Sequence, residues 1–257
     1  VSNEDSDSDS FVPSFDFSNV LINKCPLLIE LINKKKQDTL DILLSSKYFD
    51  FKERFNNHSL FYYAVSNELF DFARKIYNSQ KELYDINNEN LLLENAKKPE
   101  IVRFLVSFPE LNVNVKNENY ESVIDILCQD DREEKSKSSI IYLLDRPEIE
   151  FNSISLLFYS VKNDSIEIFE RAIQIITKKD KSDSNTKSYN FLLNDIIDIK
   201  RYNFYIKFIK SGLISIDNDE IVQQCIRLSN PKVYTEICHD KIPQEKEIQA
   251  FYHSIIN

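Results

Sequence analysis

The residues whose types could do chemistry are few and widely spread in this chain. Cys238 and His239 are adjacent and both could bind a metal, but neighbouring side chains point apart and no second pair stands nearby. The other cysteines, Cys25, Cys128 and Cys225, show no spacing typical of a zinc site or a disulfide framework. We therefore interpret the cysteines as small buried hydrophobes and expect no metal site.

The sequence also lacks residue patterns typical of general acid–base catalysis or of phosphate binding. Asp130 with Asp131 and Glu133 with Glu134 lie in a charged segment, with no apolar pocket predicted to raise a carboxyl pKa. The single glycine excludes a Gly-rich phosphate loop, and the three histidines are isolated from one another. We expect a protein that is not an enzyme and takes no cofactor.

The charge balance limits the classes of partner. A net charge of −10 argues against nucleic acid and anionic membranes, because both require a contiguous basic surface. No run of about 18 apolar residues is present to span a membrane, and the acidic, Ser-rich start does not resemble a signal peptide. We expect an intracellular, cytoplasmic chain with a protein partner.

Two similar phrases reveal an internal repeat. SLFYYAVSNELFDFARKI (59–76) and SLLFYSVKNDSIEIFERA (155–172) are 96 residues apart, and related phrases stand between and beyond them. The units begin near residues 25, 59, 90, 122, 155, 190 and 220. A period near 33 residues is typical of a stacked solenoid.

Each unit reads as a short helix, a turn and a longer helix. An apolar anchor stands two residues after each start: Leu27, Phe61, Leu92, Ile124, Leu157, Leu192 and Val222. A second apolar run follows, as in TLDILL (39–44), EIVRFLV (100–106) and FYIKFI (204–209).

These units resemble the ankyrin repeats. CPLLIEL, SLFYYAV and SLLFYSV are similar to the opening phrase of that family, and EIVRFLV and IEIFERAI are similar to its closing helix. Small or slender residues occupy the positions where the two helices of a unit approach closely: Ala64, Val65, Ala96, Cys128, Ser160, Val161, Cys225 and Ile226. The resemblance covers residues 20–240 and implies an all-α, ankyrin-like solenoid of about seven helix-turn-helix repeats.

The chain departs from the family at its turns and openings. The family places Gly at the turn between its helices, and this chain has only Gly212. We expect Asn and Asp to adopt the left-handed backbone there, for example in SNE (66–68) and KND (162–164), because they tolerate positive φ better than other non-Gly residues. Several openings also lack the Thr-Pro pair and the His of the family.

Four segments fall outside the repeat pattern. Residues 1–19 form an acidic, Ser-rich tail, and residues 129–138 and 178–188 read as loop insertions. Residues 241–257, with Pro243 at a plausible helix start, are predicted to form a capping helix over the last unit. The alternative for this last segment is an amphipathic helix that binds a partner.

The resemblance implies that the chain binds a client protein through the concave face and the hairpin tips of the stack. The first helices would offer Tyr63, Glu94, Ile126, Tyr159, Asn194 and Gln224. The tips would offer Asn56, Asn57, Asn87, Asn88, Glu89, Asn117, Glu118, Asn119, Tyr120, Asp217, Asn218 and Asp219. Tyr63 and Tyr159 either serve as interface anchors or pack against neighbouring units. The alternative function is a structural subunit that assembles through ends, loops or the convex face.

Overall fold

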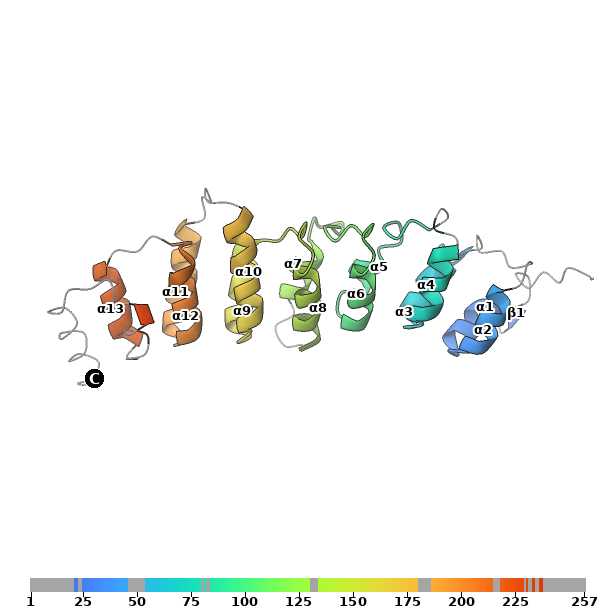
Figure 1. Cartoon of the computed structure of the whole chain (residues 1–257), viewed down its shortest axis with the longest axis horizontal. Helices are drawn as coiled ribbons and strands as arrows, with labels where there is room; N and C mark the ends of the chain where they lie inside the picture. Colours follow the sequence, from blue (N-terminus) through green and yellow to red (C-terminus); the bar gives the residue numbers. More distant parts are fainter. Residues whose placement is uncertain are drawn as a thin grey trace, which may run out of the picture. The chain divides into compact units, whose positions relative to one another are not determined.

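The computed structural model describes residues 21–22, 25–45, 54–79, 81, 84–129, 134–179, 186–214, 218–228, 230, 233 and 236–237. Thirteen helices and four two-residue strands are the regular elements of these residues, so the all-α prediction is confirmed (Figure 1). The predicted N-terminal tail (1–19) and capping helix (241–257) lie outside the described residues. The chain divides into two compact units, between Leu91 and Leu92.

The first unit contains two β-hairpins, each followed by a pair of helices. Strands β1 (Leu21–Ile22) and β2 (Cys25–Pro26) precede helices α1 (Leu27–Asn33) and α2 (Gln37–Leu44). Strands β3 (Arg54–Phe55) and β4 (His58–Ser59) precede α3 (Leu60–Ser66) and α4 (Phe70–Ser79). Helix α1 packs on α2 and α3, and α4 packs on α2 and α3, so the four helices form two layers.

The second hairpin closes through Asn56 and Asn57. Their φ angles are 50° and 66°, and they connect two antiparallel strands as a two-residue loop. Positive φ at both central residues is the requirement of a type I′ turn, whose twist matches that of the flanking strands. Asn meets this requirement at low cost, so the sequence can build the hairpin without Gly.

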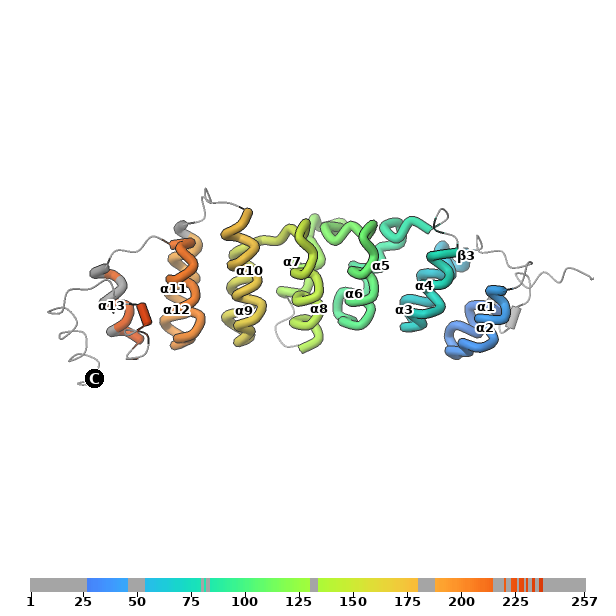
Figure 2. Tube along the Cα trace, in the orientation of Figure 1, coloured from blue at the N-terminus to red at the C-terminus, as the bar shows by residue number. Residues whose placement is uncertain are grey.

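The second unit repeats the two-layer arrangement. The short helix α5 (Leu91–Glu94) spans the division between the units. The helices α7 (Val123–Cys128), α9 (Ser153–Lys162), α11 (Thr186–Asp198) and α13 (Asn218–Leu228) pack in that order and form the first-helix layer. The helices α6 (Pro99–Val106), α8 (Glu134–Leu144), α10 (Ile166–Lys179) and α12 (Tyr202–Ser211) form the second-helix layer. Figure 2 shows the order of these helices along the chain as a tube.

The core lies between the layers of each unit. The predicted anchors Phe61, Leu92, Ile124, Leu157 and Leu192 are all buried. The small residues Ala64 and Ser160 are fully buried where the helices of a pair approach each other. The structure has the two helices predicted for each of these units, whereas the anchor Leu27 and the small position Cys128 are only half-buried.

The turn between paired helices uses the same hydrogen bonds in four places. Lys35, Glu68, Asp164 and Lys200 have φ between 52° and 63°. At the second of these, the Glu68 N–H donates to the Val65 carbonyl (2.9 Å) and the next N–H donates to the Ala64 carbonyl (2.9 Å). These are the two bonds of a Schellman motif, which ends a helix with one residue in the left-handed conformation.

The prediction that Asn and Asp occupy these left-handed positions was partly wrong. In KND the residue is Asp164, as predicted, but in SNE it is Glu68, and elsewhere it is Lys35 or Lys200. The reason is that the paired hydrogen bonds of the motif and the packing of both helices impose the backbone angle, whatever the local preference of the side chain.

Both predicted insertions are shorter than expected. Helix α8 begins at Glu134, so residues 134–138 are helical, and Ser136 is fully buried. Helix α10 continues to Lys179, and α11 begins at Thr186. The Lys- and Ser-rich composition suggested loops, but a helix in a layer buries only one stripe and tolerates polar residues on the rest.

Candidate functional site

Of the groups that sequence singled out for chemistry, the structure describes the side chains of Cys128, Cys225 and Glu134. Burial, followed by the nearby Asp125 carboxylate, raises the pKa of the Cys128 thiol to about 12, so the thiol is protonated at neutral pH. Within the described ranges, no group of three or more His, Cys, Asp or Glu side chains could hold a metal ion. Cys238, His239, Asp130, Asp131 and Glu133 lie outside these ranges.

Helices long and apolar enough to cross a bilayer are also absent from the residues that the structure describes.

Two of the six predicted first-helix contacts are buried inside the second unit. The side chain of Tyr159 is 3% exposed, and that of Gln224 is 5% exposed. Gln224 Oε1 accepts a hydrogen bond from the Tyr205 hydroxyl at 2.9 Å. The prediction that these two residues are available to a partner is therefore corrected. For Tyr159, the alternative that it packs inside the unit agrees with its burial.

The other four predicted first-helix contacts differ in how exposed they are. Tyr63 is half-buried, and its hydroxyl donates to the Phe55 carbonyl at 3.1 Å, which ties α3 to its own hairpin. Ile126 is half-buried, whereas Glu94 and Asn194 are exposed. Asn194 Oδ1 accepts a hydrogen bond from Arg227 at 3.5 Å.

Among the predicted tips of the first unit, Glu89 has a structural role. Its side chain is 8% exposed and accepts hydrogen bonds from the N–H (2.9 Å) and hydroxyl (2.8 Å) of Ser59, and it pairs with Arg54 at 3.3 Å. Ser59 is the N-cap of α3, where the helix dipole favours a carboxylate. The predicted role of Glu89 as a free tip is therefore corrected. Asn56, Asn57 and Asn88 are exposed, and Asn87 is half-buried.

The tip that precedes α7 is tightly organised. Asn117 Oδ1 accepts hydrogen bonds from the N–H groups of Asn119 (3.0 Å) and Glu121 (2.9 Å), and its amide donates to the Glu121 carboxylate (2.8 Å). The hydrogen bonds from Asn117 and Gln129 lower the pKa of Glu121. Tyr120, at φ 62°, is 84% exposed. Glu118 and Asn119 are exposed beside it, as predicted for a tip.

Two of the three residues of the last predicted tip are helical. Asp217 lies outside the described residues, and Asn218 and Asp219 belong to the first turn of α13. The repeat pattern placed the start of this helix too late.

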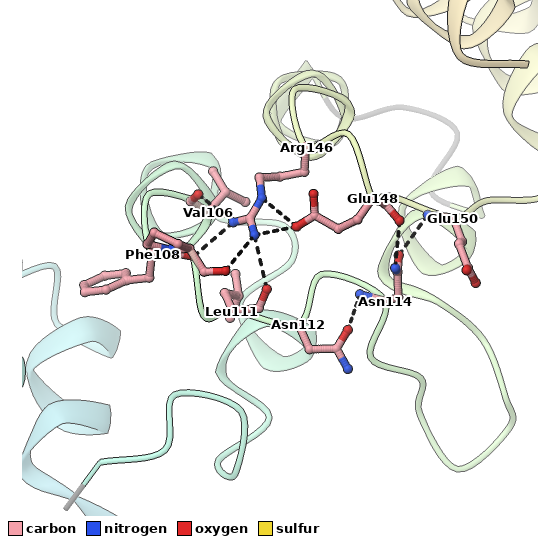
Figure 3. A network of polar contacts seen from close by, with 9 residues as sticks. Val106, Phe108, Leu111, Asn112, Asn114, Arg146, Glu148 and Glu150 are labelled. Atoms are coloured by element: carbon pink, nitrogen blue, oxygen red, sulfur yellow. Dashed lines mark hydrogen bonds and ion pairs between the residues drawn. The ribbon is translucent and has the colours of Figure 1, made fainter. Parts of the chain in front are cut away.

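An arginine that sequence reasoning missed fixes the loops before α7 and α9. The Arg146 guanidinium donates to the carbonyls of Val106 (2.9 Å) and Phe108 (3.0 Å) and more distantly to those of Pro109 and Leu111 (Figure 3). Its Nε donates to Glu148 at 2.9 Å. The side chain is only 14% exposed, so one residue links the ends of α6 and α8 through four carbonyl groups.

Asn114 extends this network toward α9. Its amide donates to the Glu148 carbonyl at 2.9 Å, and its Oδ1 accepts from the Glu150 N–H at 2.8 Å (Figure 3). The loops that lead into neighbouring first helices are thereby held together, which fixes the positions at which α7 and α9 begin.

The exposed aromatic residues of the first-helix layer were also missed. Phe158 on α9 is 45% exposed, and Phe191 on α11 is 74% exposed. On α9 the exposed positions are Ser155, Phe158 and Lys162, which lie three and four residues apart and form one stripe. The exposed aromatic residue of this stripe is Phe158, which directly precedes Tyr159, the residue that we predicted to be exposed.

The register between α9 and α11 places the two phenylalanines on the same side. Asp164 and Lys200 occupy equivalent turns, 36 residues apart, and the hydroxyls of Ser153 and Tyr189, also 36 residues apart, are 3.5 Å from each other. The same offset relates Phe191 to Ser155 on the exposed stripe of α9. We call the exposed stripes of the two helices the α9–α11 surface: Ser155, Phe158, Lys162, Phe191, Asn194, Asp195 and Asp198.

A groove of about 300 Å³ borders this surface between α7 and α9. Phe158 and Ser155 form its α9 wall together with Tyr159 and Lys162, and Asp125, Cys128 and Gln129 form its α7 wall. A half-exposed aromatic beside a shallow groove is an arrangement suited to contact with another polypeptide.

Comparison of this chain with protein-family models, curated proteins and solved structures finds no match.

Proposed function

We propose that this chain is a non-enzymatic protein-binding module built from divergent ankyrin-like repeats. Three features support the repeat assignment: the period near 33 residues, the β-hairpins before α1 and α3, and the pairing of successive helices in two layers. The further antiparallel bridge between Lys116 and Ser122, just before α7, marks a comparable hairpin position in the second unit.

The observation that carries the proposal is the exposure of Phe158 and Phe191 on neighbouring helices. Burying a phenylalanine side chain contributes about 1.5–3 kcal/mol relative to leaving it in water. The two rings lie on helices whose opposite faces are packed, so a partner could bury them without rearranging the core. We assign the client-binding function to the α9–α11 surface and its groove.

Affinity capture with matched variants tests this assignment. The tagged chain and the double variant Phe158→Ser/Phe191→Ser are compared in a native lysate by mass spectrometry. Ile42→Ser is the control, because Ile42 is 70% exposed on α2 of the first unit. We expect a protein that the chain and the control retain and the double variant loses, while circular dichroism shows that all three remain helical.

The exposure of Ile42 also favours the second candidate function, a structural subunit that assembles through another surface. If Ile42→Ser loses the captured protein and the double variant retains it, that candidate replaces the first.

A further inference from the structure

We propose that the α9–α11 surface takes a basic segment of a partner protein, one in which apolar residues alternate with Lys or Arg. This inference rests on the proposed function, since it names the chemistry of the client that binds there. The apolar residues of the proposed segment are inferred from Phe158, Phe191 and the groove. Its basic residues are inferred from the distribution of charged side chains in the second unit.

The two helix layers of the second unit carry opposite net charge. In the first-helix layer there are five acidic residues and three basic ones: Asp125, Asp195, Asp198, Asp219 and Glu220 against Lys162, Lys187 and Arg227. In the second-helix layer the balance is reversed, with Glu100, Glu134, Glu167 and Glu170 against Arg103, Lys135, Lys137, Arg171, Lys178, Lys179, Lys207 and Lys210. The layer that exposes the phenylalanines is therefore the acidic one.

The loops that lead into α7 and α9 strengthen this asymmetry. Residues 107–122 and 145–152 contain six acidic residues, and their two basic residues are Lys116 and Arg146. Arg146 and Glu148 form an ion pair whose charges cancel, which leaves five acidic residues against Lys116. Glu118 and Glu150 are exposed in these loops. A field of one sign on one side of a domain steers a partner of the opposite sign to that side.

On α11 the apolar and acidic elements are adjacent. Asp195 follows Phe191 by four residues, and both are exposed, so they lie on one helix face a single turn apart. A partner that covers Phe191 with an apolar side chain would bring a neighbouring Lys or Arg to Asp195. Of the basic side chains that the structure describes in this layer, Lys162 belongs to the α9–α11 surface, and Arg227 is paired with Asp198 at 2.7 Å.

The experiment uses three labelled peptides of equal length and fluorescence anisotropy with the full chain. The first peptide alternates Lys with Leu and Phe, the second replaces each Lys with Glu, and the third replaces each Leu and Phe with Ser. We expect the first to bind, and the other two to bind at least about tenfold more weakly, with affinity for the first falling as salt rises from 0.05 M to about 0.3 M.

Two charge-reversal variants locate the site. Asp195→Lys should weaken binding of the Lys-rich apolar peptide by about tenfold, whereas Glu100→Lys, on α6 of the opposite layer, should change it by less than about twofold. Neither Asp195 nor Glu100 makes an ion pair in the described residues, so both variants should remain folded.

The outcomes separate this inference from the function on which it rests. If the Glu-rich apolar peptide binds as tightly as the Lys-rich one, and Phe158→Ser/Phe191→Ser abolishes both, the surface binds protein and the basic partner is wrong. If Asp195→Lys and Glu100→Lys weaken binding equally, attraction is non-specific and the inference fails. If the double variant changes no peptide affinity, the assigned surface itself is wrong.

Discussion

At the scale of single residues, Arg146 has the largest structural role that the polar contacts reveal. Its guanidinium has five N–H donors in a planar fork, and the surrounding loop presents four carbonyl groups and one carboxylate to it. No other residue type supplies so many donors from one buried position, so the loop depends on this side chain.

We expect Arg146→Ala to lower the free energy of unfolding by about 2–4 kcal/mol, because it leaves several partly buried carbonyls without a donor. Arg146→Lys should recover less than half of the loss, since an ammonium keeps the charge and lacks the fork. Urea unfolding followed by circular dichroism measures both. Arg227→Ala is the control, because its ion pair with Asp198 is exposed and should contribute less than about 1 kcal/mol. Equal losses in Arg146→Ala and Arg227→Ala would contradict this role.

A substitution at Ser139 on α8 should raise the stability of the protein. The Ser139 side chain is fully buried, and its hydroxyl has no hydrogen-bond partner in the described part of the chain. Removing a buried hydroxyl that lacks a partner avoids its desolvation cost, so Ser139→Ala should raise the free energy of unfolding by about 1 kcal/mol. The same urea titration checks it, and a variant less stable than the parent would show that the hydroxyl is satisfied.

At the scale of elements, the turns between paired helices combine good hydrogen bonding with an unfavourable residue type. Lys200 has φ 56°, where Gly pays no steric penalty from a β-carbon. The two N–H groups of the Schellman motif at this turn, from Lys200 and Arg201, donate to the carbonyls of Ile197 and Ile196 at 3.0 Å each. The side chain of Lys200 is exposed, so its removal should cost little packing.

We therefore expect Lys200→Gly to raise the melting temperature, by an amount equivalent to about 1 kcal/mol. Gln174→Gly is the matched control, because Gln174 is exposed in the interior of α10, where Gly should destabilise by about 0.5–1 kcal/mol. Differential scanning calorimetry compares the two. Equal destabilisation of both variants would show that Lys200 carries no backbone strain at this turn.

The helix pairs could be predicted from the sequence because their cause is local and repeated. Phe61, Ile124 and Leu157 mark the same position in three units, and a helix with one apolar stripe must bury it against its neighbours. The exposed stripe could not be predicted to the residue. Whether Phe158 or Tyr159 faces water depends on how far α7 and α11 cover the flanks of α9, which is decided by packing.

The roles of Arg146 and Glu89 could not be predicted from the sequence either, because they too depend on tertiary packing. Each acts on groups about 30–40 residues away along the chain, and those groups come into reach only after the helix pairs have packed. A charged residue in a loop is usually solvated, so neither side chain carried a sequence signal that distinguished it from its neighbours.

At the scale of the whole molecule, a chain of net charge −10 contains a unit with one acidic and one basic helix layer. The acidic layer carries the exposed phenylalanines and a groove, and its leading loops are fixed by the Arg146 network. This combination supports a binding surface whose shape is set before the partner arrives, which reduces the entropy lost on binding.

Site-specific photo-crosslinking in a native lysate shows directly whether a protein binds at the α9–α11 surface. A photoreactive phenylalanine analogue is placed at position 158 in one sample and at Gln174, exposed on α10 of the opposite layer, in another. We expect a discrete covalent adduct with one protein from position 158, lost when Phe191→Ser is added, and none from position 174. An adduct that forms from position 174 and not from position 158 would contradict the assignment of binding to the α9–α11 surface.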